Sequence, residues 1–451
     1  MAKNDMGIVV VVALFLAALL SGCGPVETAD QQLQALIAAQ DIRPFEPGPP
    51  ADPALVALGQ ALFFDKELSG NRDISCATCH HPTLGTTDNL PLSMGTGGQG
   101  LGVERQFGDG RILIARNAPD VYNRGSAAWQ TMFWDGRAAA SARGYFVSPA
   151  GSQLPPGLDN ILAVQAMFPV TSVDEMRGLP GDLDVFGQPN ELALIPEDDW
   201  TTLWESLMAR LLALPGYVAL FQAAYPAVPP ADLTFVHAAN ALAAFESDAF
   251  NQCQSPWYHY LQGDTAALSE TAKRGAVLFF GAAGCGQCHS GSLLTDQAYH
   301  NLAAPQLGPG KGVEAPLDYG RFRETARPED KFAFRTPSLL NVAATGPWLH
   351  NGAYATLEAV IAHHQDPAAA LSAYDAAAHL PAYLQDSVQQ DPALHQEMLA
   401  SLAPQLAAAR RLGPGEIEAL LAFLQALTDT AVFDLAGVQP TAVPSGLPVQ
   451  D

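Results

Sequence analysis

The chain has 451 residues, of which 48% are hydrophobic, so it is long enough for two or three domains with cores of their own. Its 46 acidic residues outnumber 22 basic ones, which gives a formal net charge of −24. This charge argues against nucleic acid as a partner, whereas it could steer a basic partner protein or simply keep the chain in solution.

The amino terminus has the pattern of an exported protein. Residues 8–20 form an unbroken apolar run that is too short for a bilayer span and ends in Leu20-Ser21-Gly22-Cys23. This ending resembles a bacterial lipobox, which predicts a signal peptide over residues 1–22 and a lipid anchor on Cys23. An ordinary cleaved signal followed by a free thiol is the alternative. Both interpretations place the folded part on the periplasmic or extracytoplasmic side.

The remaining segments predict a mainly α fold. Residues 23–53 contain a short helical stretch followed by five prolines between Pro44 and Pro53, which is typical of an anchor and tether. Residues 85–110 are rich in glycine and predict a loop, and residues 434–451 predict an extended tail that lies on the body or is disordered. No long alternating strand pattern is present, and apolar repeats of helical spacing occur at 55–64, 199–214, 232–250, 269–280 and 415–427.

Two copies of C-x-x-C-H carry the chemistry, one at Cys76, Cys79 and His80 and the other at Cys285, Cys288 and His289. Each is the signature of a covalently bound haem c, with two thioether bonds from the cysteines and an iron ligand from the histidine. A zinc knuckle or a redox-active cysteine pair is the alternative, but zinc would need further cysteine and histidine pairs that the chain does not offer at matching spacing. The chain therefore divides near residue 255 into two cytochrome c-like haem domains, 54–255 and 256–433, packed around a central interface.

Several strings outside these motifs resemble the bacterial di-haem cytochrome c peroxidase and MauG family, in the same order along roughly residues 50 to 430. Because several independent strings agree in order and spacing, the resemblance is specific. The strings are Leu68-Ser69-Gly70-Asn71-Arg72-Asp73-Ile74-Ser75, Arg116-Asn117-Ala118-Pro119, Phe133-Trp134-Asp135-Gly136-Arg137, Tyr299-His300-Asn301-Leu302, Phe334-Arg335-Thr336-Pro337-Ser338-Leu339, Leu349-His350-Asn351-Gly352 and Ala355-Thr356-Leu357-Glu358.

The resemblance implies a division of labour between the two haems. The haem on His80 would react with hydrogen peroxide, the haem on His289 would relay electrons to it, and Trp134 matches the tryptophan between them. Gln165 and Glu175 match the family's distal glutamine and catalytic glutamate. Peroxide cleavage needs a base that takes a proton from the near oxygen and returns it to the leaving one, which suits Glu175. The alternatives are that Glu175 is a solvated residue or that Asp174 is the base.

Two departures from the family pattern affect the iron ligands. The loop over residues 92–98 lacks the histidine that blocks the peroxide-reactive iron in members requiring reductive activation, so we predict an open, five-coordinate iron. Met94 could ligate in principle, but packing in the core is its more ordinary role. At the second haem, His364 matches the position of the family's methionine or tyrosine ligand, which predicts bis-histidine ligation by His289 and His364. The alternative is that His363 and His364 are both surface residues.

The resemblance also implies partners and a further ion. Asn117 and Thr336 match positions that contribute to a calcium ion between the haems. The predicted activity is hydrogen peroxide reduction with electrons from a small redox protein, in a chain that could form a homodimer. The alternatives are MauG-like oxidation of a protein or organic substrate through a high-valent two-haem state, and a non-catalytic di-haem electron carrier.

Overall fold

The computed structural model describes residues 27–108, 110–407 and 410–450. The predicted signal peptide, 1–22, and the predicted lipid anchor at Cys23 lie outside the described residues. Within the described ranges, no single helix has the length and apolar composition to cross a membrane. The helices Trp200–Leu212 (α6) and Pro215–Ala224 (α7) meet those criteria only as a pair, and they are bent by 104° relative to each other.

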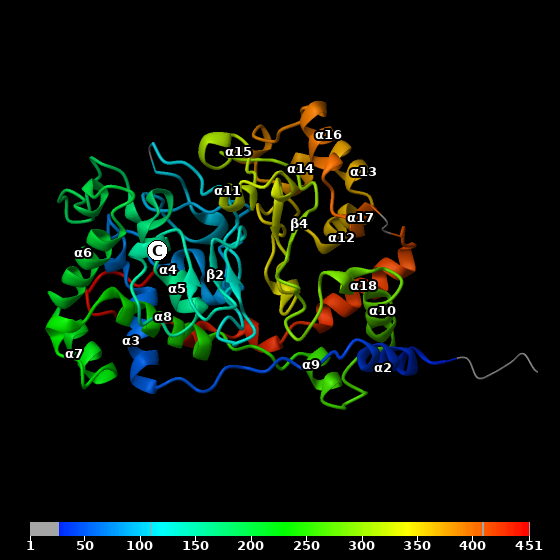
Figure 1. The fold of residues 1–451 in the computed structure, drawn as a ribbon, viewed down its shortest axis with the longest axis horizontal. Helices are drawn as coiled ribbons and strands as arrows, with labels where there is room; N and C mark the ends of the chain where they lie inside the picture. The colour runs from blue at the N-terminus through cyan, green and yellow to red at the C-terminus, as the bar shows by residue number, and fades with distance from the viewer. Residues whose placement is uncertain (1–26, 109, 408–409, 451) are drawn as a thin grey trace, which may run out of the picture.

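The molecule consists of two mainly helical halves that lie side by side, which confirms the predicted fold class (Figure 1). Strands are short and form one three-stranded and one two-stranded antiparallel sheet, β1-β2-β3 and β4-β5. The first half contains α3 (Pro53–Phe64), α4 (Cys76–Cys79), β1 (Thr131–Met132), β2 (Ala138–Ala140), β3 (Phe146–Val147), α5 (Ile161–Ala166), α6, α7 and α8 (Phe235–Ala249). The second contains α9 (Pro256–Leu261), α10 (Glu270–Phe280), β4 (Tyr299–Asn301), α11 (Phe322–Thr325), β5 (Ala333–Arg335), α12 (Leu357–Gln365), α13 (Pro367–Ser372), α14 (Ala376–His379), α15 (Ala382–Gln385), α16 (Pro392–Ala400), α17 (Pro404–Ala407) and α18 (Pro414–Ala426).

Each half is built on a closely crossed helix pair, α3 with α8 in the first half and α10 with α18 in the second. A glycine permits each crossing, because a Cβ on Gly59 would lie 1.9 Å from the Ala241 carbonyl oxygen and one on Gly275 would lie 1.9 Å from that of Ala419. Four and five residues after each glycine stand two phenylalanines, in the sequences Gly59-Gln60-Ala61-Leu62-Phe63-Phe64 and Gly275-Ala276-Val277-Leu278-Phe279-Phe280. The two halves therefore repeat one packing motif, which the sequence analysis did not identify.

Each end of the described chain packs on the half that is farther from it in the sequence (Figure 1). Helix α2 (Ala29–Ala39) precedes the first half but packs on α10 of the second, where Asp30 forms an ion pair of 2.9 Å with Lys273. The segment after α18 returns to the first half, where the Ser445 hydroxyl donates a hydrogen bond of 2.6 Å to the buried Asp65 carboxylate. The interpretation of residues 23–53 as an anchor and tether did not anticipate the docked helix.

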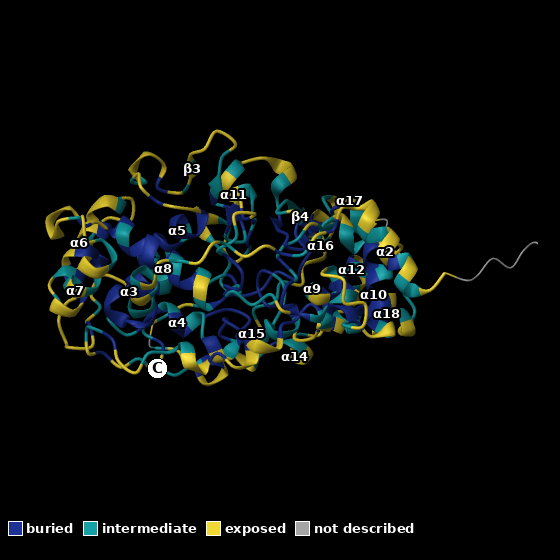
Figure 2. Cartoon of the chain, turned by 90° about the horizontal axis from the view of Figure 1, so that it is seen from below, coloured by how far each residue is buried: buried dark blue, intermediate teal, exposed yellow. Residues whose placement is uncertain are grey.

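Buried ion pairs connect the first half to the second at their interface. Arg116 of the first half forms ion pairs with Asp135 of the same half and with Asp318 of the second, the latter at 2.6 Å. All three side chains are buried, as are most residues between the halves, whereas exposed residues concentrate on the outer helices and loops (Figure 2). This arrangement fixes the segments around residues 117–134 and 335–350 against each other.

Candidate functional site

A cavity of about 230 Å³ lies between the two halves and collects several of the predicted site residues. The second motif contributes Cys285, Cys288 and His289 to its wall, and α12 contributes His364. Asn117, Trp134 and Thr336 also line it. The other predicted residues, Cys76, Cys79, His80, Gln165 and Glu175, are not part of the lining of this cavity.

His289 is oriented as an iron ligand requires. Its Nδ1 lies 3.2 Å from the Leu294 carbonyl oxygen, which holds the ring and leaves Nε2 free to ligate. Burial lowers the pKa of His289 to about 4, so the imidazole is neutral and its ligand nitrogen unprotonated near pH 7. The residues present therefore fit a haem bound at Cys285 and Cys288.

The two adjacent histidines of α12 have different surroundings. His363 is fully buried, with Nδ1 2.8 Å from the Tyr354 hydroxyl and Nε2 2.7 Å from the Leu302 carbonyl oxygen. His364 uses Nδ1 for a 2.8 Å contact with the Val360 carbonyl oxygen and lines the cavity that contains His289. Only His364 thus has an Nε2 without a protein partner on the cavity side, which supports its predicted role as the second ligand.

The first motif repeats this local geometry in the other half. Cys76 and Cys79 bound the short helix α4, and Nδ1 of His80 lies 3.3 Å from the Thr86 carbonyl oxygen. Burial raises the pKa of the Cys76 thiol to about 12 and lowers that of His80. Both histidines are therefore held through Nδ1 by a main-chain carbonyl a few residues further along the chain, as a haem ligand commonly is.

Trp134 is fixed at the cavity wall by both halves. Its indole Nε1 donates a hydrogen bond of 2.9 Å to the Asn117 carbonyl oxygen, and its own carbonyl oxygen accepts one of 2.8 Å from the amide of Arg335. A partly buried indole held in this way has little freedom to reorient.

Glu175 lies on a π-helical turn, Val173–Arg177, and is partly buried. Burial raises the pKa of its carboxyl group, opposed by the positive charges of Arg137 and Lys311. Gln165 is on α5, one turn before the 3-10 segment Pro169–Thr171 that leads into the π turn. Gln165 and Glu175 thus lie on helical segments that the short 3-10 segment connects, and Glu175 is near the charge of Lys311 from the second half.

The loop over residues 92–98 is packed against this turn. The amide of Thr96 donates a hydrogen bond of 2.8 Å to the Glu175 carbonyl oxygen, and the Asp73 carboxylate accepts from the Thr96 hydroxyl at 2.7 Å. Arg105 donates to the Met94 carbonyl oxygen at 2.8 Å, and the Met94 side chain is buried. The loop therefore has fixed contacts of its own, in keeping with the packing role expected for Met94.

The residues matched to a calcium site are also buried at the cavity. Asn117 donates from Nδ2 to the Leu90 carbonyl oxygen at 2.8 Å, and the Thr336 carbonyl oxygen accepts from the Thr295 hydroxyl at 2.7 Å. Both groups thus have protein partners, and a calcium ion between them stays a prediction.

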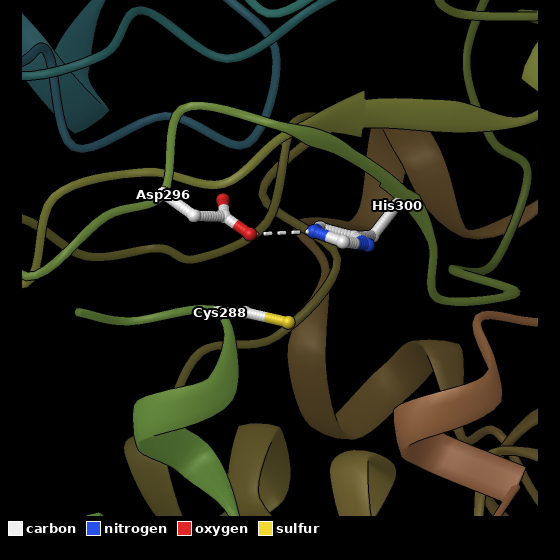
Figure 3. Close-up of side chains that lie close together, drawn as sticks. All are labelled: Cys288, Asp296 and His300. Carbon is white, nitrogen blue, oxygen red and sulfur yellow. Dashed lines mark hydrogen bonds and ion pairs between the residues drawn. The ribbon is translucent and has the colours of Figure 1, made fainter.

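Cys288, Asp296 and His300 form a cluster that the sequence analysis did not identify (Figure 3). One ligand atom of each lies within 4.8 Å of the others, and His300 Nε2 is 2.8 Å from the Asp296 carboxylate. The hydrogen bond to the Asp296 carboxylate raises the pKa of His300, which favours an ionic pair. Since a thioether bond would consume the Cys288 thiolate, the cluster fits an ion pair beside the haem attachment better than a zinc site. The i, i+4 spacing of Asp296 and His300 was the one signal of this pair in the sequence, and such a spacing is too common to indicate a site.

Comparison with known proteins agrees with this arrangement. Residues 53–266 match the family model described as di-haem cytochrome c peroxidase. The chain is 34% identical over 343 residues to the methylamine utilization protein MauG of Methylorubrum extorquens, covering 74% of this chain and 76% of that relative. It is 31% identical over 295 residues to the cytochrome c551 peroxidase of Pseudomonas aeruginosa, covering 65% and 67% respectively.

Solved structures show the same similarity. A MauG-like protein associated with microbial copper homeostasis superposes with a TM-score of 0.58 at 27% identity, covering 86% of this chain and 95% of that one. The di-haem peroxidase BthA from Burkholderia thailandensis shares the fold, with a TM-score of 0.55 at 22% identity over 89% of this chain and 91% of that one. With two haem-attachment motifs in two matching helical halves, the chain belongs to the di-haem cytochrome c peroxidase and MauG family of oxidoreductases, a family that carries two c-type haems.

Proposed function

We propose that the protein reduces hydrogen peroxide in its first half with electrons that enter through its second half. Cys76, Cys79 and His80 would hold the haem of the first half, and Cys285, Cys288, His289 and His364 would hold that of the second. A haem bound at His80 would supply the iron on which peroxide is reduced, and one at His289 would relay the two electrons that this reduction consumes. The single observation that carries the proposal is the different surroundings of the two motifs, one leading to a fixed loop without histidine and the other facing His364 across a cavity.

The acid and base chemistry is assigned to Glu175. Its carboxylate takes the proton from the near oxygen of peroxide and returns it to the far oxygen, which leaves as water. Burial raises its pKa toward the working range of a group that must both accept and donate a proton. Gln165 orients peroxide from the preceding turn.

Trp134 connects the two halves in this proposal. It lines the cavity with His289 and accepts a main-chain hydrogen bond from Arg335, which supports its assignment as the group between the two haems. Its indole provides the aromatic group through which electrons pass, and Trp134→Phe should slow electron transfer between the halves without removing either haem.

A second candidate is the oxidation of a protein or organic substrate, as its relationship to MauG proteins suggests. The observation that favours it is His364, because two imidazole ligands give a lower potential than histidine with methionine and so favour oxidised states of the second haem. The fixed loop over residues 92–98 supports the same candidate, since it leaves no histidine to be displaced before peroxide binds.

One experiment separates the candidates. Stoichiometric hydrogen peroxide is added to the fully oxidised protein, and absorbance and electron paramagnetic resonance are followed over time. A long-lived oxidised form without prior reduction supports substrate oxidation, whereas reaction only after reduction by a small redox protein supports the peroxidase. Absence of any reaction, with six ligands on both irons, would make the protein an electron carrier and refute the proposal.

Location and assembly complete the proposal. The two haem domains are assigned to residues 54–255 and 256–433, on the periplasmic side, with a lipid at Cys23 as the link to the membrane. The electron donor is proposed to be a small redox protein, for which an acidic surface would favour a basic partner. A calcium ion at Asn117 and Thr336 and a homodimer belong to the same proposal.

A further inference from the structure

Two buried arginines, one from each half, stack on the same tryptophan at the interface. The guanidinium carbon of Arg124 lies 4.3 Å from the ring centre of Trp129, and that of Arg335 lies 5.2 Å from it. Trp129 is 2% exposed, and Arg124 and Arg335 are 5% and 4% exposed. The indole Nε1 of Trp129 donates to the Asn123 carbonyl oxygen at 2.9 Å, which fixes the ring on which both cations rest. Two like charges are thus held together out of water.

Ion pairs with described carboxylates balance only part of this charge. Among the described residues, Arg124 pairs with a single carboxylate, that of Asp120 at 3.1 Å, and its Nη1 is buried without a hydrogen-bond partner. Arg335 donates to main-chain oxygens of Phe133 and Thr336, and no described carboxylate pairs with it. Burial and the neighbouring charge of Arg124 together lower the pKa of Arg335 to about 9. A buried, unpaired charge of this kind is costly unless an anion compensates it.

Both arginines also line the cavity that contains Cys285, Cys288 and His289. Since Asp120 pairs with Arg124, one positive charge of the two guanidinium groups has no paired carboxylate. An anion that enters this cavity would balance it. The haem attached there brings carboxylates of its own, because haem c carries two propionate groups, and a guanidinium binds a carboxylate through two parallel hydrogen bonds.

We propose that Arg124 and Arg335 bind a propionate carboxylate of the haem attached at Cys285 and Cys288. The site joins the two halves through the cofactor, since Arg124 comes from the first half and Arg335 from β5 of the second. The two guanidinium groups offset the negative charge of the propionate, which would otherwise stabilise the oxidised iron, and therefore raise the reduction potential of this haem, opposing the effect of the second imidazole at His364. The inference depends on haem attachment at the second motif, which is part of the proposed function, but it does not depend on peroxide turnover.

The test measures the reduction potential of the haem of the second half in the intact protein. Arg335→Gln, Arg124→Gln and the double variant are prepared, and mass spectrometry establishes that two haems are attached. Spectroelectrochemical titration at pH 8, where propionates are ionised, should give a lower potential in each single variant and the lowest in the double variant. Arg335→Lys, which keeps the charge, should remain closer to the wild type than Arg335→Gln.

Arg321→Gln is the matched control. Arg321 also stacks on an aromatic ring, that of Tyr299 at 4.3 Å, and donates across the interface to the Asp135 carbonyl oxygen at 2.7 Å, but it does not line the cavity. In Arg321→Gln the reduction potential of the haem of the second half should equal that of the wild type. Unchanged potentials in Arg335→Gln and Arg124→Gln with both haems attached would overturn the inference and leave the proposed function intact, whereas a wild-type protein without the second haem would refute the proposed function.

A measurement on the wild type covers the case in which the variants do not mature. Protein carrying haem labelled with carbon-13 at the propionate carboxylates is oxidised and reduced at pH 6, and infrared difference spectra are recorded. Ionised carboxylate bands that shift with the redox state are the expected result. The absence of any labelled band of an ionised carboxylate in both redox states would contradict binding by two guanidinium groups.

Discussion

At the scale of single residues, Glu175 and Asp174 are neighbouring carboxyl groups whose surroundings differ. Burial raises the pKa of both carboxyl groups and the positive charge of Lys311 opposes this in both, whereas the positive charge of Arg137 lowers the pKa of Glu175 alone. Arg137 itself stacks on the Phe133 ring at 3.6 Å, beside the Trp134 segment. One of the charges that stabilise the ionised form of Glu175 therefore comes from the same segment as Trp134.

We expect Glu175→Gln to lower the peroxide turnover number by about 100- to 10,000-fold, because the amide cannot carry the proton between the two oxygens. Steady-state kinetics with both haems attached measure the effect. Asp174→Asn is the control and should keep turnover within a few-fold of the wild type. The reverse outcome would assign the base to Asp174.

The pH dependence follows from the same carboxyl group. Since burial raises the pKa of Glu175 above its ordinary value and the ionised form must accept the proton, turnover should fall as the pH drops through that raised value and be retained above it. The pH profile of kcat measures this limb. In Glu175→Gln the limb should be absent, and its persistence there would show that another group titrates.

His363 and His364 allow a test of ligation by adjacent residues. His364→Met should keep a low-spin second haem and raise its reduction potential, because a thioether ligand favours the reduced iron. His363→Gln should leave the haem spectrum unchanged but lower stability by about 1–3 kcal/mol, since it disrupts buried hydrogen bonds to Tyr354 and Leu302. A spectral change in His363→Gln with none in His364→Met would reverse the assignment.

At the scale of helices, the glycine crossings of α3 with α8 and of α10 with α18 decide how closely each pair packs. In both pairs the rings after the glycine meet a phenylalanine of the partner helix, with centroids 5.2 Å apart for Phe63 and Phe245 and 5.2 Å for Phe279 and Phe423. Both rings lie on the helix that precedes a C-x-x-C-H motif, which begins 12 residues after Phe64 in the first half and five residues after Phe280 in the second.

Gly59→Ala and Gly275→Ala should each destabilise the protein by about 1–3 kcal/mol, because the added methyl group would force a helix pair apart. Alanine is the better helix former, so a loss of stability would show that the contact outweighs propensity. Thermal unfolding measures the change. Gly415→Ala, where a Cβ meets no atom within 4 Å, is the matched control and should be neutral or slightly stabilising.

At the scale of the whole molecule, the chain ends bind the halves to each other. Helix α2 contacts the second half mainly through its packing on α10, since the Asp30 and Lys273 pair is partly exposed and contributes little by itself. The segment after α18 reaches the first half, where Asp65 is fully buried and accepts hydrogen bonds from the Tyr217 hydroxyl at 2.8 Å and from Ser445. The carboxyl-terminal segment is therefore part of the first half's core contacts.

Ser445→Ala should lower stability by about 1–3 kcal/mol, because it removes a hydrogen bond from a buried carboxylate that has no access to water. Differential scanning calorimetry measures the loss. Thr441→Ala, at an exposed position of the same segment, should leave the melting temperature unchanged. Equal melting temperatures for all three proteins would show that the segment does not stabilise the first half.

The sequence by itself determined the two haem-attachment motifs, the mainly helical class and the family. Each of these is carried by short strings or by local periodicity: C-x-x-C-H needs five consecutive residues, and the helices at 55–64, 199–214, 232–250, 269–280 and 415–427 were predicted within about three residues of their observed bounds. His364 could be selected over His363 by counting from Leu357, and its position on the cavity supports that choice.

Only the tertiary structure decided which groups face each other across the interface. Arg124 and Arg335 are more than two hundred residues apart, yet they share one indole and one cavity, and Asp65 and Ser445 are nearly at opposite ends of the described chain. Nothing in a local pattern encodes such pairs, because they arise from the packing of two separately built halves and from the charge that this packing leaves uncompensated.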